Sequence, residues 1–419
     1  MRGAGAPAGY IARMSPDEKH WTLAAAGFRN QNDAAYNRAG ELFTYDADME
    51  WDLGMPWYRP TRVCHVVDGA EFGWRSVSGK WPQDYEDSLP PMLNIGGGSP
   101  TGVAFGYGAK FPSRYQEALY VADWTYGKLY AVHLKEAGAT YSGLMEVFVE
   151  GRGLKLTDLV VNPKDGAMYF AGGSRRSTSA LYRVSYSGKE SVAESVPASD
   201  PKAATLRALR HQLEAGYYGA DEASLALALA RLKKTDQRDT LFRRLEELGW
   251  GKLPPETRLD VVRALQVVAV RLGDPEGALL EKLHGAMPSL ESRWNVEASQ
   301  LLVRWKSPRA AREIFPLFEK APTQEEQMSF AARLRLVSEV WPEGAREKFF
   351  RWFLREEFHK AGHPATFITD TRKDAVDSLT DAEKVALEKV LSAPPESGPA
   401  PPVASRLFVK DWGTDELIA

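Results

Sequence analysis

An arginine–asparagine pair stands out in this chain as a group that could bind a cofactor. Arg29 and Asn30 follow an apolar segment, Trp21–Phe28. A guanidinium offers a forked donor that matches the carboxylates or carbonyls of a planar, anionic cofactor. The alternative is a plain turn, in which Asn30 caps the loop and Arg29 pairs with a neighbouring acid. We take the pair as a candidate cofactor-binding site.

Four acidic residues alternate along the next segment, and a β-strand would point all of them to one face. They are Asp46, Asp48, Glu50 and Asp52. Carboxylates this close repel one another unless a cation lies among them, and their hard oxygen atoms suit Ca²⁺. Arg59 and Arg62 are nearby counter-ions that could take the place of a metal. The sequence therefore predicts a calcium site, with an arginine-compensated loop or a solvated loop as alternatives.

Aromatic residues are frequent around these acids and could line a sugar cleft by stacking. They are Trp51, Trp57, Tyr58, Trp74, Trp81 and Trp124. Packing between the sheets of a domain is the commoner role of such side chains, because each buries a large apolar area. A ligand role for any one of them is thus an alternative to a structural role.

Short strands are expected to position these residues. Between residues 9 and 187, apolar segments rich in β-branched and aromatic residues alternate with turns that contain Gly, Pro or Asp. A turn followed by Leu-Tyr-x-Val recurs at Lys128 and Ala180, and such repetition is typical of a β-propeller. At four strands per blade these segments make about three blades, fewer than a ring needs. We expect residues 1–195 to form a partial β-propeller, as a fragment whose earlier blades lie upstream.

The second half of the chain has a different pattern. From about Asp200 the apolar residues recur with the period of an amphipathic helix, and prolines stand near the expected helix starts. Helix pairs recur about every 35–45 residues, a spacing typical of HEAT-like repeats. We expect a multidomain β + α protein, with a HEAT-like α-helical solenoid over residues 200–391. Residues 392–419 are a Pro-rich linker and a short tail.

Composition excludes several classes of protein. The chain has 419 residues and a formal net charge of −3, so it has no basic excess for binding nucleic acid. Its single cysteine, Cys64, excludes intramolecular disulfides and a covalent haem, which needs Cys-x-x-Cys-His. We expect no transmembrane segment, because no run of about 18 apolar residues occurs. The first residues also lack the apolar core of a signal peptide.

Motifs of the first half resemble those of the glucose/sorbosone dehydrogenase propellers, which use pyrroloquinoline quinone (PQQ). These motifs are Gly27-Phe-Arg-Asn, Gly40-Glu-Leu-Phe, Gly69-Ala-Glu-Phe-Gly-Trp, Ser99-Pro-Thr-Gly-Val-Ala-Phe and Leu156-Thr-Asp-Leu. The domain order is similar to that of the large membrane-bound dehydrogenase-like, haem-binding-domain proteins of planctomycetes and verrucomicrobia. The motifs cover about residues 9–187, and the resemblance of the helical half depends on domain order alone.

The resemblance implies a periplasmic or extracellular oxidoreductase that oxidises a sugar or alcohol. Electrons would pass to a c-type cytochrome, either a partner or a haem domain missing from this chain. Arg29 and Asn30 match the family pair beside quinone and substrate, and Lys155 is the basic residue where the family has quinone-binding arginines. The family's acidic pair near its calcium falls on Thr61 and Arg62, and its catalytic histidine has no counterpart here. The alternative function is a non-catalytic carbohydrate- or protein-binding propeller with a helical scaffold.

Overall fold

The chain divides into two compact units, Met1–Ala215 and Gly216–Ala419. The division lies one helix beyond residue 195, where the sequence predicts the propeller to end. The computed structural model describes residues 8–52, 57–75, 88–174, 177–194, 196, 199–214, 235–275, 279–338, 340–359, 363–397 and 402. Most of the predicted linker and tail, residues 392–419, therefore lies outside the described residues.

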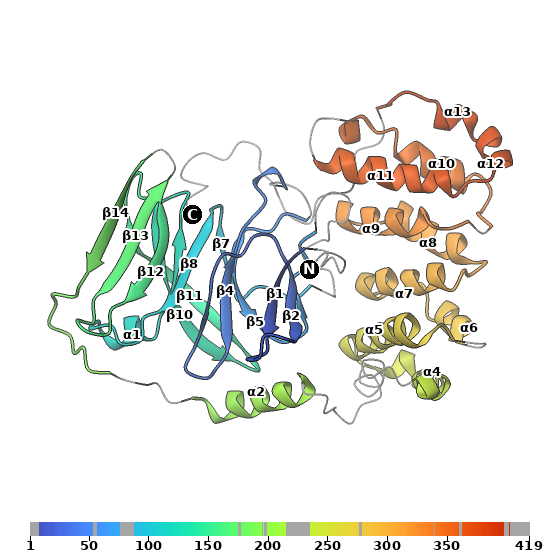
Figure 1. The fold of residues 1–419 in the computed structure, drawn as a ribbon. Coiled ribbons are helices and arrows are strands. Elements are labelled where there is room, and N and C mark those ends of the chain that lie inside the picture. The colour runs from blue at the N-terminus through green and yellow to red at the C-terminus, as the bar shows by residue number, and fades with distance from the viewer. Residues whose placement is uncertain are drawn as a thin grey trace. The chain divides into compact units, whose positions relative to one another are not determined.

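The described strands of the first unit form four small sheets (Figure 1). Sheet A holds β1 (Gly9–Met14), β2 (Trp21–Phe28) and the short β6 (Ala70–Glu71). Sheet B holds β3 (Ala34–Tyr36), β4 (Leu42–Asp46), β5 (Thr61–Val66) and β7 (Leu93–Gly96). Sheet C holds β8 (Pro100–Phe105), β9 (Leu119–Asp123), β10 (Lys128–Ala137) and β11 (Thr140–Glu150). Sheet D holds β12 (Leu156–Val161), β13 (Met168–Ser174) and β14 (Ser177–Val184).

The first strands of sheets B, C and D lie beside one another, since β8 contacts both β3 and β12. The Thr101 hydroxyl donates to the carbonyl of Leu156 at 3.0 Å, and the Val103 amide donates to Asp33 at 2.8 Å. Antiparallel sheets whose first strands lie side by side are typical of successive β-propeller blades. The predicted mixed β and α architecture with part of a propeller is thus supported, and the described strands do not close into a ring.

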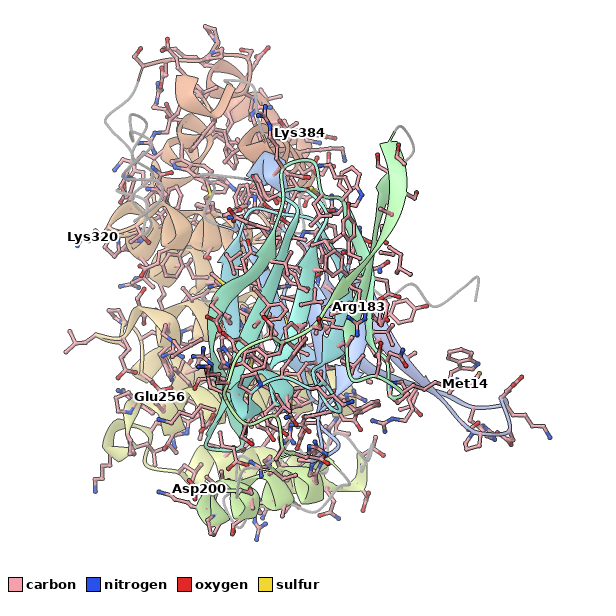
Figure 2. The ribbon with its side chains drawn as sticks, turned by 90° about the vertical axis from the view of Figure 1, so that its left-hand side faces the viewer. Met14, Arg183, Asp200, Glu256, Lys320 and Lys384 are labelled. Carbon is pink, nitrogen blue, oxygen red and sulfur yellow. The ribbon has the colours of Figure 1, made fainter. Side chains whose placement is uncertain are left out.

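Four sheets occur where the sequence predicts about three blades. The extra sheet arises because β3 and β7 are only three and four residues long, too short to show an alternating pattern. They complete sheet B around β4 and β5, while β1 and β2 form the separate sheet A. Figure 2 shows Met14 at the end of the β1–β2 hairpin, which extends beyond the other sheets of this unit.

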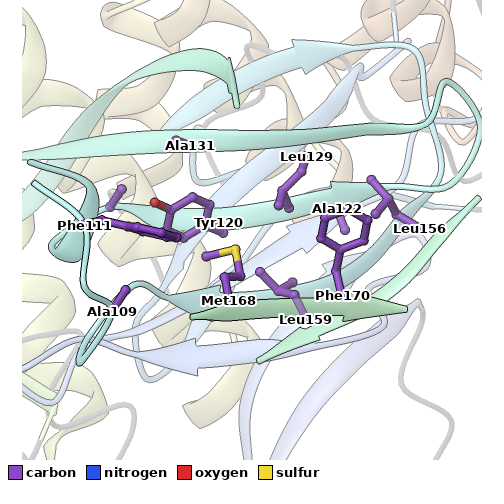
Figure 3. Packing of buried hydrophobic residues seen from close by; sticks show 11 residues of the cluster. Ala109, Phe111, Tyr120, Ala122, Leu129, Ala131, Leu156, Leu159, Met168 and Phe170 are labelled. Carbon is purple, nitrogen blue, oxygen red and sulfur yellow. The ribbon is translucent and has the colours of Figure 1, made fainter. Parts of the chain in front are cut away.

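Apolar side chains from neighbouring sheets hold this arrangement together. In the cluster of Figure 3, Tyr120 of sheet C lies beside Met168 of sheet D, and Ala122 of sheet C lies beside Phe170 of sheet D. A second cluster joins sheets B and C, where the rings of Phe43 and Phe105 meet edge to face with centroids 5.9 Å apart. Burial of each such side chain contributes roughly 1.5–3 kcal/mol to stability. These clusters fix the sheets, and hence the loops at the ends of their strands.

Helices make up the second unit. They are α4 (Arg238–Glu247), α5 (Pro255–Leu272), α6 (Leu279–Gly285), α7 (Ser292–Arg304), α8 (Ala310–Glu319), α9 (Gln324–Leu334), α10 (Ala345–Trp352), α11 (His363–Asp377), α12 (Asp381–Ala386) and α13 (Glu388–Leu391). The 3-10 turns are η3 (Thr235–Gln237), η4 (Trp250–Lys252) and η5 (Glu356–His359). In succession, α5 packs on α7, α7 on α9 and α9 on α11. This stacking suits a helical repeat array, and its assignment to the HEAT type stays a prediction.

Several predicted helix bounds differ from those of the structure. Apolar periodicity predicts helices over residues 324–340 and 345–358, and in the structure these helices end early, at Leu334 and Trp352. Helix α11 has no counterpart in the sequence prediction, because Thr366, Thr369 and Thr371 lower its intrinsic helix propensity. Two further helices, α1 (Ser113–Gln116) and α2 (Pro201–Glu214), belong to the first unit. Within the described residues, the helices are too short or too polar to cross a bilayer.

Candidate functional site at the loop end of the sheets

All of the predicted site residues lie at one end of the sheets of the first unit. Arg29 and Asn30 follow β2, Asp46 ends β4, and Lys155 precedes β12. These ends of sheets B, C and D lie together, because β8 donates from the Val103 amide to Asp33 before β3 and from the Thr101 hydroxyl to the carbonyl of Leu156 in β12. We call this the loop end. Its described loops are residues 29–33, 47–52, 57–60, 97–99, 124–127 and 151–155.

Asp46 is a structural residue with a full set of partners. Its carboxylate is completely buried and accepts the backbone amides of Arg29 at 3.0 Å and Asn30 at 2.9 Å. Arg62, also buried, donates to it from Nη2 at 2.8 Å and from Nε at 3.2 Å. Arg62 further donates to the carbonyls of Gly27 and Phe72. The arginine-compensated alternative therefore describes Asp46, and this carboxylate has no capacity left for a metal.

The prediction that these four acids lie on one face of a β-strand is wrong. Strand β4 ends at Asp46, and Glu50–Asp52 form a 3-10 turn, so Asp48, Glu50 and Asp52 do not continue a strand. The carboxylate of Asp46, the last residue of the strand, accepts the amides of the 29–30 loop. In the described part of the chain, no three His, Cys, Asp or Glu side chains are grouped closely enough to hold a metal ion. Calcium binding stays a prediction without support from the described geometry.

Asp48 is a buried acid at this end with unused hydrogen-bonding capacity. It is 4% exposed, and its Oδ2 accepts the hydroxyl of Tyr58 at 3.0 Å. Its Oδ1 is buried and has no hydrogen-bond partner among the described residues. Burial raises the pKa of Asp48 above its ordinary value, against the opposing effects of the Tyr58 hydroxyl and the Arg29 charge. A buried carboxylate oxygen without a donor is unfavourable, and such atoms occur where a ligand or water completes the bonding.

Other polar groups converge on Asp48. The Arg29 guanidinium lies 4.0 Å from Glu50 and 3.8 Å from the sulfur of Met49. A Cβ atom at Gly97 would lie 3.3 Å from the Tyr126 hydroxyl oxygen and 4.0 Å from Asp48 Oδ2, so glycine keeps this space open. We call the group of Arg29, Asp48, Tyr58, Gly97 and Tyr126 the Asp48 site.

Sequence reasoning found only part of the Asp48 site. It singled out Arg29 and Asp48, and it named Tyr58 only among aromatic residues that could stack on a sugar. It missed Tyr126. The sequence feature that could have identified this residue is its position in the Asp123–Gly127 turn between two strands. Asp123 holds that turn by accepting the amides of Ser99 at 2.7 Å and Thr125 at 3.0 Å, which ties it to the 97–99 loop.

The other candidate cofactor residues have different surroundings. Lys155 donates from Nζ to the carbonyl of Thr125 at 2.9 Å and lies 4.4 Å from the centroid of the Trp124 ring. Trp124 donates to the Gly173 carbonyl at 3.2 Å, so Lys155 and Trp124 join the loops of sheets C and D. Asn30 contributes its backbone amide to Asp46. The described contacts do not bring Lys155 to the Asp48 site.

The Asp48 site fits a neutral polar ligand better than the quinone. PQQ carries three carboxylates, which need several cations or amide donors around them. The described site offers one cation, Arg29, and that cation faces Asp48 and Glu50. Its charge balance is therefore acidic, and these residues by themselves do not fit a tricarboxylate. A polyhydroxylated ligand suits the site because each hydroxyl both donates and accepts hydrogen bonds.

Comparison with known proteins finds similarity among solved structures. No protein-family model matches the chain, and no curated protein matches it. A protein assigned as a glucose dehydrogenase from Thermus thermophilus is 24% identical over 38% of this chain and 46% of that chain, with a TM-score of 0.31. The PQQ-bound aldose sugar dehydrogenase of Streptomyces coelicolor is 16% identical over 42% of this chain and 51% of that chain, with a TM-score of 0.33.

The apo-form of the soluble aldose sugar dehydrogenase of Escherichia coli is 15% identical over 36% of this chain and 43% of that chain, with a TM-score of 0.29. The chain thus spans about half the length of each of these proteins. They belong to the same class of sugar dehydrogenases that the sequence motifs resemble. At this low similarity they carry no argument about the site, which depends on the residues described above.

Proposed function

We propose that the loop end of the first unit is the ligand site of a propeller oxidoreductase that acts on a sugar or alcohol, and that this chain supplies part of that site. The observation that carries the proposal is the buried Asp48 Oδ1, which has no donor among the described residues. The motif resemblance adds the reaction class, a quinone cofactor, a cytochrome acceptor and a location outside the cytoplasm, all as parts of the proposal.

The residues of the Asp48 site take separate roles in this proposal. Asp48 accepts a hydrogen bond from a ligand hydroxyl through Oδ1, while the hydroxyl of Tyr58 holds its other oxygen. Arg29 and the hydroxyl of Tyr126 donate to further ligand oxygens, and Gly97 leaves room for them. Because the described residues do not fit the quinone, no step of the reaction is assigned to them. Arg29, Asn30 and Lys155 stay predicted contacts of a quinone. The other contacts of that quinone would come from the rest of the protein.

Titration calorimetry of the chain with D-glucose and glycerol tests the proposal. Asp48→Asn is expected to weaken binding about tenfold, because it replaces a charged acceptor in a buried hydrogen bond. The same variant is expected to raise the melting temperature by a few degrees, since a buried carboxylate with an unpaired oxygen destabilises the fold. Asp68→Asn is the matched control, because Asp68 pairs with Arg13 at the surface and should leave binding unchanged.

Two results would count against the proposal. Absence of sugar or glycerol binding by the folded chain would remove the loop end as a ligand site of this chain. Equal weakening by Asp48→Asn and Asp68→Asn would show that the site lies elsewhere. A parallel titration with PQQ, with and without Ca²⁺, tests the cofactor separately, and calcium-dependent binding weakened by Arg29→Ala would support it.

The acidic balance of the Asp48 site also favours a second function, a carbohydrate-binding propeller without catalysis. The two differ in their dependence on the quinone. Sugar-dependent reduction of a dye that requires added PQQ would support the oxidoreductase. Sugar binding with the same affinity in the presence and absence of PQQ, and no dye reduction, would support the binding module.

A further inference from the structure

A pocket in the second unit lies between two neighbouring helix turns. It encloses about 710 Å³ beside residues 248–252, which join α4 to α5, and residues 285–290, which join α6 to α7. The turns are adjacent because α4 packs on α6 and α5 packs on α7. This volume is in the range of pockets that bind small organic molecules.

The floor of this pocket is aromatic. The rings of Trp250 and Trp294 meet edge to face with centroids 6.3 Å apart, and both side chains are almost fully buried. The indole N–H of Trp250 donates to the carbonyl of Leu245 at 2.8 Å, so the polar atom of this ring has a partner within the protein. The part of the Trp250 ring that lines the pocket is therefore apolar. Leu290, fully exposed, adds apolar surface at the rim.

Within the described part of the chain, the charged residues that line this pocket are all cations, namely Lys252, Arg258 and Lys282. Arg258 donates to Glu291 at 2.8 Å and is balanced by it, so the excess positive charge comes from the two lysines. An ammonium group has three donors, and among the described residues Lys282 has one acceptor, the carbonyl of Leu248 at 2.7 Å. Its Nζ lies 5.0 Å from the centroid of the Trp250 ring. Burial lowers the pKa of Lys282, with partial compensation by Glu246.

We propose that this pocket binds a small organic carboxylate with an aromatic or aliphatic body. The apolar body would lie against the tryptophan floor, and the carboxylate would accept hydrogen bonds from Lys282 and Lys252. A carboxylate fits because it supplies the acceptors that the partly desolvated Lys282 lacks, and a charged acceptor strengthens each bond. The buried Nε of Arg258, which has no acceptor among the described residues, is a further donor at the same place.

Calorimetric titration of the whole chain with naphthalene-2-carboxylate tests this proposal, with naphthalene-2-carboxamide as the neutral control of the same shape. For a ligand of this size we expect a dissociation constant of about 0.1–1 mM. The amide is expected to bind at least about tenfold more weakly, because it lacks the charge. Added salt should weaken binding of the carboxylate, because Lys252 is exposed to solvent and salt screens exposed charges.

Two variants separate the charge from the space of the pocket. Lys282→Met keeps the apolar stem and removes the ammonium, and it should weaken carboxylate binding about tenfold. Gly285→Leu fills the pocket, because a Cβ at Gly285 meets no atom within 4 Å, and it should abolish binding while both lysines remain. Lys348→Met is the matched control, since Lys348 pairs with Glu319 on α8 away from the pocket.

The proposal is overturned if the carboxylate and the amide bind equally, if neither is bound at millimolar concentration, or if Lys282→Met and Gly285→Leu both bind as the unchanged chain does. Circular dichroism confirms that each variant is folded before it is titrated. These readouts concern the second unit alone, so they are independent of the sugar titrations that test the loop end.

Discussion

At the scale of single residues, two neighbouring acids of the loop end have different roles. Asp46 and Arg62 form a buried ion pair in which each side chain has several further hydrogen bonds. Asp48, two residues later, keeps one oxygen without a donor among the described residues. A buried pair that is fully hydrogen-bonded holds structure, whereas a buried acid with spare capacity is available to a ligand.

Removal of Arg62 is expected to be strongly destabilising. Arg62→Met leaves the Asp46 charge buried without its partner, which lowers the free energy of unfolding by about 3–5 kcal/mol. Urea unfolding of the variant and of Arg13→Met measures the difference. The exposed Arg13–Asp68 pair should contribute less than about 1 kcal/mol. The double variant Asp46→Asn/Arg62→Met should recover part of the loss, and a loss in Arg62→Met no larger than in Arg13→Met would contradict this role.

Ser307 and His284, both buried, and Glu313, half-buried, have the atomic order of a hydrolase triad but a structural role. The Ser307 hydroxyl lies 3.0 Å from His284 Nε2, and His284 Nδ1 lies 2.7 Å from Glu313. Ser307 is 0% exposed, and its hydroxyl oxygen accepts the amide of Arg309 before helix α8. A nucleophile must reach its substrate, so this row is better explained as a polar link between α6 and α8.

At the scale of elements, helix α2 is joined to the sheets through two glutamates. Glu41, buried between β3 and β4, accepts Arg210 at 2.6 Å and lies 3.1 Å from His211, both on α2. His65 of β5 bonds the same carboxylate at 2.9 Å. In the middle of α2, Arg207 pairs with Glu136 of β10 at 2.6 Å. These ion pairs therefore attach α2 to the β unit, although the sequence pattern assigns this helix to the helical half.

The pairing of Glu41 predicts a pH-dependent stability of the first unit. Burial by itself would raise the pKa of Glu41, but the hydrogen bonds from His65 and Arg210 outweigh it and lower the pKa from 4.5 to about 2. The contribution, on the order of 3 kcal/mol, is therefore complete above about pH 4.5 and is lost as the pH falls toward 2.

Glu41→Gln should accordingly lower the free energy of unfolding at pH 7 and flatten its decrease between about pH 4.5 and 2. Chemical unfolding at a series of pH values measures both effects. Glu150→Gln is the control, because Glu150 is 65% exposed and only loosely paired with Lys128. An unchanged slope in Glu41→Gln would show that another acid carries the pH dependence.

At the scale of the whole molecule, the described sheets present open edges. Strand β14 has a neighbour on one side only, β13, and Leu181 on it is 71% exposed. The β1–β2 hairpin, with Met14 at its end in Figure 2, exposes Trp21 and Leu23 as well. Unpaired edges and exposed apolar strand residues favour association between chains.

We expect the chain to form concentration-dependent oligomers that Leu181→Lys shifts toward the monomer, because a charge on an edge strand opposes strand pairing. Sedimentation velocity over a range of concentrations measures the shift. Val385→Lys on α12 is the matched control, since Val385 is equally exposed but lies on a helix. Equal effects of the two variants would assign association to general hydrophobicity instead of the β14 edge.

Local features of this protein could be predicted from the sequence. The change from strand to helix near residue 200, most strands of sheets C and D and most helix starts follow from apolar periodicity and from turn residues. These features depend on residues close together in the chain. Short strands such as β3, and the Thr-rich helix α11, were missed because tertiary packing decides them against weak local signals.

The roles of the site residues depended on contacts that only the tertiary structure shows. The sequence by itself determined that Arg29 follows an apolar segment and that Asp46 and Asp48 belong to one short run of acids. It could not separate the two acids, because their difference comes from Arg62 and Tyr58 on the other side of a loop and from Tyr126 in another sheet. Burial and choice of partner arise from residues far apart in the chain, and these decide which carboxylate is neutralised and which stays available to a ligand.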